Sequence, residues 1–486
     1  MQPPSRTARR RTLRVATLVA PAAAALFFAS QAATANVALT QVSHDIYTDA
    51  QAQHNTEVEP DTFAFGSTIV AAFQVGRVSG GGASNIGWAT STDGGATWSH
   101  GYLPGITGNA GGSFGQVSDA SVAYDARHNV WLISTIGING SSVVVLTSRS
   151  TDGGLTWGNP VTTATGDNDK NWIVCDDTAT SPHYGNCYTE YDIAGSGDSL
   201  RMRTSTDGGA TWGAALAPSG LQRAGLGGQP VVLANGDVIV PYLSLADTIR
   251  FFRSTNGGTS WGSTALIASV SHHTVAGGLR EEALPSAEVD GAGTVYVAWA
   301  DSRFRSGGSS NDIVVAKSTS ETTWAAPVRV PIDTTSSTVD HFIPGIGVDR
   351  STSGATARVG LTYYFYPTSS CTAATCQLEA GFISSVNGGA SWSAPTQLAG
   401  PMSLSWIPNT SQGRMFGDYI STSVLAGGNA YPVLPVANAP TGSTFDLAMY
   451  APTGGLPITG GGNTITRTAA APAAPATAGV RSSTAN

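Results

Sequence analysis

The sequence contains little charge, and most of the charge it has is negative. Only 12% of its 486 residues are Asp, Glu, Lys or Arg, and the formal net charge at pH 7 is −8. Proteins that bind nucleic acids need clustered cations against the phosphate backbone. This composition therefore argues against a nucleic-acid partner. An anionic ligand would have to be held by a local group of arginines rather than by the overall charge.

Long apolar runs are absent beyond the N-terminal segment. Residues 1–35 combine five arginines, the apolar stretch Val15–Phe28 and the small-residue sequence Ala33–Ala35. These are the three parts of a secretion signal peptide and its cleavage site. No later run reaches the roughly 18 apolar residues of a membrane span. We therefore expect an extracellular, monomeric protein, exported through a Gram-positive-type signal peptide and without a membrane span.

Cysteine is scarce, with four residues in the whole chain. An even number in an exported protein fits an oxidising compartment and disulfide pairing. Three pairings are possible, and we favour the two local ones, Cys175 with Cys187 and Cys371 with Cys376. The cysteines lack the paired CxxC spacing of metal sites, and we expect neither a metal ion nor a cofactor.

Helical periodicity is also absent, whereas glycine is abundant, with 59 residues. Short alternating apolar runs, such as those at 67–75 and 294–301, lie between Gly/Ser/Asp turns and are typical of strands. An octapeptide, written STDGGATW in its first copy, recurs among these runs. Its copies are Ser91–Trp98, Ser150–Trp157, Ser205–Trp212, Ser254–Trp261 and Ser385–Trp392, with a degenerate version at Ser318–Trp324.

This repeat predicts an all-β propeller of four-stranded antiparallel blades, because several strands recur about every 50–65 residues. We favour seven blades over six and assign residues 36–452 to this single domain. Residues 35–49 are expected to supply a missing outer strand that closes the ring. Residues 453–486, rich in Ala, Pro, Thr and Gly, are expected to be a disordered tail. The tail contains LPITG at 456–460, but the apolar span and basic end of a cell-wall anchor do not follow, so we do not expect anchoring.

The octapeptide has the composition of a turn staple. Its acidic or amide side chain can accept hydrogen bonds from the turn, its Gly-Gly pair permits positive φ, and its tryptophan can cover the seam between strands. Because asparagine replaces aspartate in two copies, charge is not essential there, which favours a structural role. These positions are Asp93, Trp98, Asp152, Trp157, Asp207, Trp212, Asn256, Trp261, Asn387 and Trp392.

The motif Ser-x-Asp-x-Gly-x-Thr-Trp resembles the Asp-box of the sialidase superfamily, and the repeats cover roughly residues 60–450. The resemblance implies a propeller in which the boxes lie on the rim, away from the face that binds the ligand. It also implies glycosidase chemistry on a glycan or glycoconjugate. The Arg-Ile-Pro motif that precedes the first box in sialidases is absent here, where the only arginine between residues 36 and 91 is Arg77.

Polar residues concentrate in the segments expected to reach the ligand face of a propeller. These segments lead into each first strand or join a second strand to a third. We interpret several arginines and an acid there as substrate-binding residues, since guanidinium groups bind carboxylates in bidentate fashion. They are Arg77, Arg280, Arg303, Arg305, Arg414 and Asp418.

Candidate catalytic residues follow from the need of glycosidic cleavage for an acid and a second carboxylate or nucleophile. We assign these roles to Glu282 and Asp301, and to Tyr188 with Glu190 as a tyrosine–carboxylate pair. Two structural alternatives stand beside them. Asp301 and Arg303 would equally form a local ion pair, and Tyr188 would pack between blades.

Three functions are compatible with this sequence. The leading hypothesis is a secreted, sialidase-like glycoside hydrolase acting on an acidic extracellular glycan. The alternatives are a non-catalytic propeller that binds a glycan or a protein, and a polysaccharide lyase. A fold does not determine its chemistry, so the choice depends on how the site residues are arranged.

Overall fold

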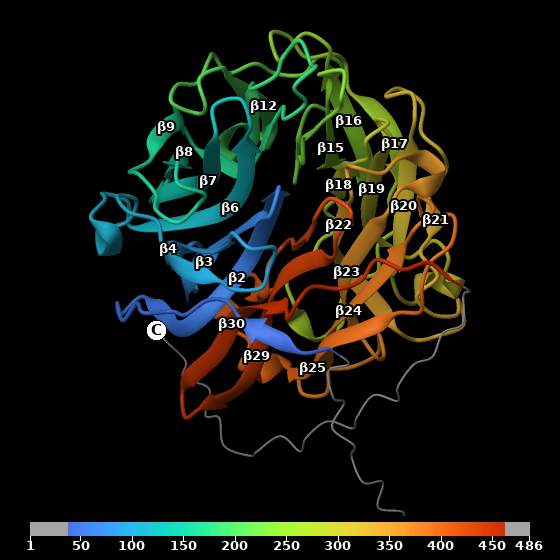
Figure 1. Cartoon of the computed structure of the whole chain (residues 1–486). Helices are drawn as coiled ribbons and strands as arrows, with labels where there is room; N and C mark the ends of the chain where they lie inside the picture. The colour runs from blue at the N-terminus through green and yellow to red at the C-terminus, as the bar shows by residue number, and fades with distance from the viewer. Residues whose placement is uncertain (1–36, 462–486) are drawn as a thin grey trace, which may run out of the picture.

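A computed structural model describes residues 37–461, and these residues form an all-β structure. The strands follow one another around a common centre, as the colour gradient of Figure 1 shows. The predicted signal peptide lies outside the described residues, as do residues 462–486 of the predicted tail. In the part that is described, no helix is long and apolar enough to cross a membrane. The helices there are short 3-10 turns: η1 Gly108–Ala110, η2 Ala194–Ser196, η3 Ala276–Gly278, η4 Ser306–Gly308, η5 Gly354–Thr356 and η6 Leu404–Trp406.

The strands pair antiparallel with their neighbours in sequence and so form consecutive meanders. This follows from the sequence, in which short apolar runs are separated by tight Gly/Ser/Asp turns. The meanders are β2 Ala52–Phe65, β3 Thr68–Val78, β4 Ala83–Ser91 and β5 Ser99–Tyr102; β6 Gln116–Asp125, β7 Val130–Asn139, β8 Ser142–Ser150 and β9 Val161–Ala164; β10 Asn168–Cys175, β11 Cys187–Ile193 and β12 Ser199–Ser205; β13 Gly225–Leu226, β14 Val231–Val232, β15 Val238–Ser244, β16 Thr248–Ser254 and β17 Ala265–Ser269; β18 Ser286–Val289, β19 Val295–Asp301, β20 Asp312–Ser318 and β21 Val328–Arg329; β22 Asp340–Val348, β23 Val359–Tyr366, β24 Gln377–Ser385 and β25 Thr396–Ser403; and β28 Ser421–Val424, β29 Ala430–Thr441 and β30 Thr444–Pro452. The short pair β26 Asn409–Thr410 and β27 Gly413–Arg414 precedes the last meander.

The first strands of neighbouring meanders lie against one another. β2 contacts β6, β6 contacts β10, β18 contacts β22, and both β22 and β2 contact β28. The first strands therefore surround the centre of the molecule, and the residues that lead into them gather at one end of that centre.

The N-terminal segment supplies an outer strand to the last meander, as predicted from the sequence. β1 Leu39–Gln41 pairs antiparallel with β30, opposite residues 450–452. Just beyond β1, the Ser43 hydroxyl group accepts a hydrogen bond from the Met449 amide at 2.8 Å, and it donates one to the buried Glu57 carboxyl group on β2. The two ends of the described chain are thus joined through one buried acid.

Residues 453–461 remain part of the folded structure, although the sequence placed them in the tail. Leu456 and Ala430 exchange backbone hydrogen bonds of 2.8 Å. Leu456 and Ile458 are buried in the same apolar cluster as β24 and β29 residues. The apolar residues of the LPITG sequence therefore serve as core side chains here.

Each octapeptide forms the predicted turn. In the second copy, the Asp152 carboxylate accepts hydrogen bonds from the Thr156 amide at 2.9 Å, the Thr156 hydroxyl at 2.5 Å and the Ser150 hydroxyl at 2.8 Å. Burial by itself would raise the pKa of Asp152, but these hydrogen bonds together outweigh it and lower the pKa to about 2. In the fourth copy, Asn256 Oδ1 accepts the Ser260 amide at 3.0 Å, so an amide makes the same turn.

The hydrophobic core sits between adjacent meanders, and the octapeptide tryptophans seal it. Trp157 is 8% exposed and packs in the cluster shared by the β2–β5 and β6–β9 meanders. The octapeptides lie at the end of the sheets where β2 stops, because the Gly94 amide donates to the Ser67 carbonyl at 2.8 Å in the β2–β3 turn. That end is opposite the one where the first strands begin.

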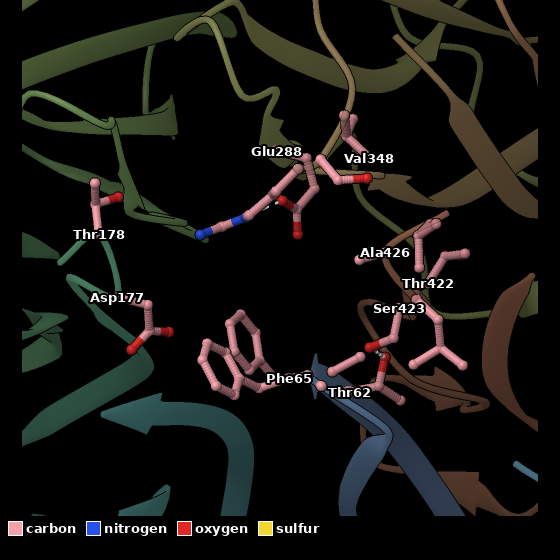
Figure 2. Close-up of a pocket in the computed structure, with 16 residues that line it drawn as sticks. Thr62, Phe65, Asp177, Thr178, Glu288, Val348, Thr422, Ser423 and Ala426 are labelled. Atoms are coloured by element: carbon pink, nitrogen blue, oxygen red, sulfur yellow. Dashed lines mark hydrogen bonds and ion pairs between the residues drawn. The ribbon is translucent and has the colours of Figure 1, made fainter. Parts of the chain in front are cut away.

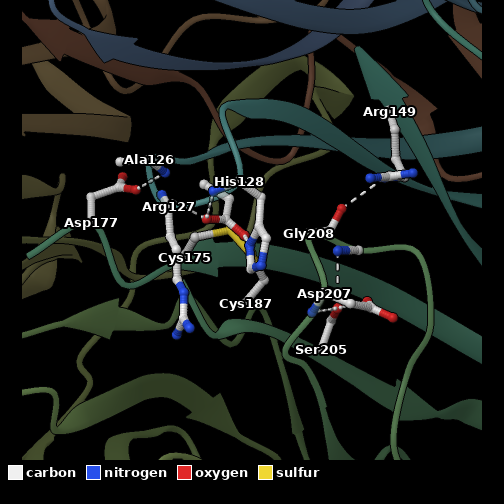
Figure 3. Close-up of a disulfide and its surroundings, with 12 residues drawn as sticks. Ala126, Arg127, His128, Arg149, Cys175, Asp177, Cys187, Ser205, Asp207 and Gly208 are labelled. Carbon is white, nitrogen blue, oxygen red and sulfur yellow. Dashed lines mark hydrogen bonds and ion pairs between the residues drawn. A yellow bond between two sulfur atoms is a disulfide. The ribbon is translucent and has the colours of Figure 1, made fainter. Parts of the chain in front are cut away.

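Both disulfides have the local pairing favoured from the sequence. Cys175 bonds Cys187 across the facing ends of β10 and β11, and Cys371 bonds Cys376 within one loop. Figure 3 shows the first disulfide beside Ala126 and Asp177. The pairing fixes the loop that connects β10 to β11.

Candidate functional site

Three charged residues project from bulges in the first strands. Glu59 on β2, Asp119 on β6 and Lys170 on β10 have φ values of 56°, 52° and 30°, where the pairing register of each strand shifts. Positive φ costs a residue with a side chain about 1–3 kcal/mol and is found preferentially at functional sites. A bulge redirects the side chain away from the regular alternation of the strand. Each bulge therefore places one charged group at the centre of the ring of first strands.

These residues form a single electrostatic cluster, which we call the central cluster and define as Glu59, Asp119, Asp169, Lys170, Arg280 and Asp418. Its members come from the β2, β6 and β10 strands and from the segments before β18 and β28. Burial, followed by the carboxylates of Asp418 and Asp119, raises the pKa of Glu59 to about 8. Arg280 and Lys170 oppose this shift, so charges from four other segments act on this one carboxyl group.

Arg280 and Asp418 form the solvent-facing ion pair of the cluster. Arg280 Nη2 donates a hydrogen bond to Asp418 Oδ2. The Arg280 side chain is 27% exposed and the Asp418 side chain is 14% exposed. The Asp418 amide donates to the Glu59 carboxyl group at 3.1 Å, which holds the pair above that buried acid. Glu59 therefore orients the Arg280–Asp418 pair from its buried side, and the other side of the pair is accessible to solvent.

Arg414 lies on the segment that pairs with the Arg280 segment. Residues 279 and 414 form a parallel bridge, and the Arg280 amide donates to the Arg414 carbonyl at 2.7 Å. The Arg414 side chain donates to the Ile407 carbonyl and has no carboxylate partner within residues 37–461. Its charge is therefore available to an anionic ligand.

Arg77 lies beneath this face and does not reach solvent, since it is only 2% exposed. Its Nε donates to the Met415 sulfur at 3.0 Å, and its Nη1 donates to the Val78 carbonyl at 2.9 Å. Burial lowers the pKa of Arg77, and the Glu59 carboxylate opposes that shift. Arg77 thus supports the segment that carries Arg414 and Asp418 from below.

Lys170 is held by aromatic rings. Its Nζ lies 3.4 Å from the Tyr419 ring centroid and 5.0 Å from that of Trp172. Its neighbour Asp169 accepts the Lys170 amide at 2.9 Å. Burial and then the Asp119 carboxylate raise the pKa of Asp169 to about 6. Cation–π contacts stabilise an ammonium group whose Nζ has no hydrogen-bond partner in the described part of the chain.

A cleft of about 360 Å³ opens beside the cluster and is lined by Glu282. Burial of the carboxyl group and then the Asp418 carboxylate raise the pKa of Glu282. The same cleft contains the pair formed by His272 and Glu281, with 2.8 Å between Nε2 and Oε2. Its other wall is apolar and contributed by Leu226, Leu243, Leu245 and Val270.

Glu190 is close to the cluster, but it is not paired with Tyr188. Glu190 is 1% exposed, and neither of its carboxyl oxygens has a hydrogen-bond partner in the described part of the chain. Burial raises its pKa well above the usual range, with a further contribution from Asp192. Tyr188 is fully buried and packs edge-on against Trp261 with centroids 6.3 Å apart. This geometry matches the alternative interpretation, in which Tyr188 packs between sheets.

Asp301, Arg303 and Arg305 lie in local networks rather than in the central cluster. Asp301 is fully buried and accepts hydrogen bonds from the Trp299 indole at 3.0 Å and from Arg303 Nε at 2.8 Å. Arg305 is buried between Asp312 at 2.5 Å and Asp333 at 2.7 Å. The structure therefore brings together the side chains of Arg280, Asp418 and Glu282 of the predicted residues, with Arg77 below them and Glu190 nearby. The Arg414 backbone pairs with the segment that carries Arg280, whereas its side chain donates to the Ile407 carbonyl.

One further group has the composition of a metal site. Ligand atoms of Asp312, Asp333 and His341 lie within 4.8 Å of one another. Both aspartates are already ion-paired with Arg305 and Arg329. Because these guanidinium groups neutralise the carboxylates, the group is explained as a buried ion-pair network.

The aromatic support of the site was missed in the sequence analysis. Trp172 lies on β10 and Tyr419 just before β28, and nothing in their spacing connects them to Lys170. The only usable signal was position, because both follow a polar residue at the entry to a first strand.

No protein-family model matches this sequence. No curated protein matches it either. Among solved structures, it is similar to the NanB sialidase of Streptococcus pneumoniae, with 13% identity over 85% of this chain and 69% of that one and a TM-score of 0.42. It is also similar to the Fusarium graminearum arabinofuranosidase Arb93A, with 14% identity over 72% and 98% and a TM-score of 0.44. A Dyadobacter fermentans protein of unknown function shares 16% identity over 72% and 99%, with a TM-score of 0.45. All of these TM-scores are below 0.5, so none of these similarities assigns an activity to this chain.

Proposed function

We propose that this protein is a secreted, sialidase-like glycoside hydrolase that acts as a monomer on an acidic extracellular glycan. The observation that carries the proposal is the solvent-facing group at the central cluster. Glu282, a carboxyl group with a raised pKa, lies beside the ion pair of Arg280 with Asp418, and the Arg414 backbone pairs with that of Arg280. Glycoside hydrolysis needs a protonated acid, a second carboxylate and, for an acidic sugar, a cationic binding group.

The proposed roles follow from exposure and partners. Glu282 is the general acid, because its raised pKa keeps a proton available and it lines the open cleft. Asp418 is the second carboxylate, which stabilises positive charge at the reacting sugar carbon. Arg280 and Arg414 bind the carboxylate of the sugar. Glu59 beneath them accepts the Asp418 amide and fixes the height of Asp418.

The proposed fold is a seven-bladed propeller in which each meander is one blade. The contacts of β28 with both β22 and β2, and the pairing of β1 with β30, support this count. The proposed secretion is supported by the two disulfides and by the N-terminal segment of the sequence.

The test is an assay of the purified protein on aryl sialosides and on uronic-acid oligosaccharides. The Glu282→Gln, Asp418→Asn and Arg280→Met variants should each lose most hydrolysis, with circular dichroism unchanged. Glu321→Gln is the matched control, since Glu321 contacts Arg253, Asn235 and Asp237 and no residue of the central cluster. Glycan binding without turnover would instead identify a binding propeller, and unsaturated products absorbing in the ultraviolet would identify a lyase.

A further inference from the structure

The opposite end of the first strands holds a separate cavity of about 280 Å³. Its lining includes the last residue of β2, Phe65, the loop after β10 with Asp177, and the last residue of β28, Val424. Asp177 follows Lys170 of the central cluster by seven residues, most of them in β10. An extended chain of this length spans about 20 Å. The cavity is therefore distinct from the candidate active site. Figure 2 shows Asp177, Glu288, Phe65 and Ser423 approaching it from different sides.

Asp177 presents an unsatisfied acceptor to this cavity. One of its oxygens accepts the Ala126 amide at 2.8 Å, whereas the buried Oδ2 has no hydrogen-bond partner within residues 37–461. The loop that carries it is fixed, because the Asp176 amide donates to the Asn186 carbonyl at 2.8 Å beside the Cys175–Cys187 disulfide. A buried acceptor without a partner costs free energy that a ligand donor would recover.

When both of its acids are ionised, the lining has a net negative charge. Glu288 is the second acid, and Arg350 is the single cation, 3.5 Å from Glu288 between Nη2 and Oε2. The Arg350 guanidinium also lies 5.7 Å from the ring centroid of Phe63. The neighbouring Phe65 ring is 41% exposed. A second cation would therefore meet a carboxyl oxygen that has no hydrogen-bond partner within residues 37–461. It would also meet the partly exposed Phe65 ring, which packs against Tyr124 with 4.4 Å between centroids.

We propose that this cavity binds a small organic cation of the amine or guanidinium class, with Asp177 as its counter-ion and Phe65 as its cation–π surface. A guanidinium or ammonium group supplies the donor that Asp177 Oδ2 lacks, and it compensates the excess of acids in the lining. The proposal is independent of the hydrolase activity proposed above, because it uses none of the residues of the central cluster.

The ionisation of Asp177 gives the proposal a second observable. Burial raises the pKa of Asp177 to about 8; Asp125 and Asp176 add to the shift, and Arg350 and the Ala126 amide oppose it. Glu288 also faces the cavity. Below pH 8, a cation that pairs with the carboxylate must displace the proton of Asp177. Its affinity should then rise by up to about tenfold per pH unit between pH 6 and pH 8.

The experiment is isothermal titration calorimetry of the full-length protein with agmatine and cadaverine, at pH 6, 7 and 8. We expect binding that tightens with pH and releases a proton, measured as a dependence of the heat on the buffer. Asp177→Asn, which keeps the acceptor for Ala126, should weaken binding at least tenfold and remove the pH dependence. Phe65→Leu should weaken it by several fold, and Glu321→Gln should not change it.

Two results would overturn the proposal. The first is no binding of either cation at millimolar concentration to a protein that circular dichroism shows to be folded. The second is Asp177-dependent binding of a neutral methyl hexoside in place of both cations, which would make the cavity a sugar site.

Discussion

The guanidinium group of Arg280 forms an ion pair with the carboxylate of Asp418, although 138 residues separate them in the sequence. The two residues belong to segments that enter different meanders, before β18 and before β28. Only the return of the chain around the centre brings them together. This pair is the structural basis of the first prediction.

The Arg280→Lys variant should lose about 10- to 100-fold in kcat/KM on an acidic glycan. Lysine keeps the charge but lacks the planar fork that binds two carboxylates, and a hydrogen bond to a charged group contributes about 1.5–3 kcal/mol. Steady-state kinetics would measure the change. The control is Arg253→Lys, at a peripheral ion pair, which should retain wild-type kinetics. Equal losses in both variants would show that the effect is not specific to the site.

The pH dependence of hydrolysis should report Glu282. A general acid must be protonated to act. Burial of Glu282, and then the nearby Asp418 carboxylate, raise the pKa of Glu282 above its usual value. Activity should therefore persist above the usual carboxyl range and fall as the pH rises through the raised pKa. In Glu282→Gln the remaining activity should lack this alkaline limb. A pH–rate profile unchanged in shape would assign the acid role to another group.

The buried Glu57 should make the fold less stable as the pH rises. Burial raises its pKa to about 8 in the folded protein, against 4.5 as the ordinary value. The contribution of Glu57 to the free energy of unfolding is complete below pH 4.5. It is then lost with rising pH, up to about pH 8, by up to about 1.4 kcal/mol per pH unit, because only the unfolded chain releases the proton.

Glu57→Gln should reduce the slope of the unfolding free energy against pH by the amount that corresponds to about one proton. Denaturant unfolding at pH 5, 6.5 and 8 would measure it. Asp446→Asn, at an exposed side chain, should keep the slope of the wild type. A Glu57→Gln variant with the wild-type slope would mean that Glu57 is ionised in the folded protein.

The octapeptide tryptophans should differ in their contribution to stability according to burial. Trp392 and Trp157 are 4% and 8% exposed, and each alanine variant should lose about 3–5 kcal/mol. Trp98 is only half-buried, so Trp98→Ala should cost less. Thermal unfolding of the three variants would test this order, and the reverse order would contradict the assignment of these residues to the seams.

The two disulfides should contribute unequally to stability. Cys175–Cys187 spans 12 residues and Cys371–Cys376 spans 5. Loop-closure entropy predicts losses of about 3 and about 2 kcal/mol when each pair is replaced by alanines. Denaturant unfolding of the two double variants would measure the difference. A larger loss for the shorter loop would indicate that contacts in the folded state dominate.

The sequence by itself determined the local structure. Alternating apolar runs and glycine-rich turns identified the strands, and the octapeptides identified the turns that hold them. Asp152 and Asn256 make the same turn because both present an oxygen to amides only a few residues away. The pairing of Cys175 with Cys187 was predictable for the same reason, since a short loop leaves few alternatives.

Only the tertiary structure decided which polar residues meet. Asp301 and Arg303 are two residues apart and satisfy each other, so their closeness in sequence gave no information about the centre of the molecule. Tyr188 and Glu190 share a strand, yet one packs against Trp261 and the other lies near Lys170. Arg280, Asp418 and Glu59 form one group because the first strands surround a common centre, and their bulges turn single side chains toward it.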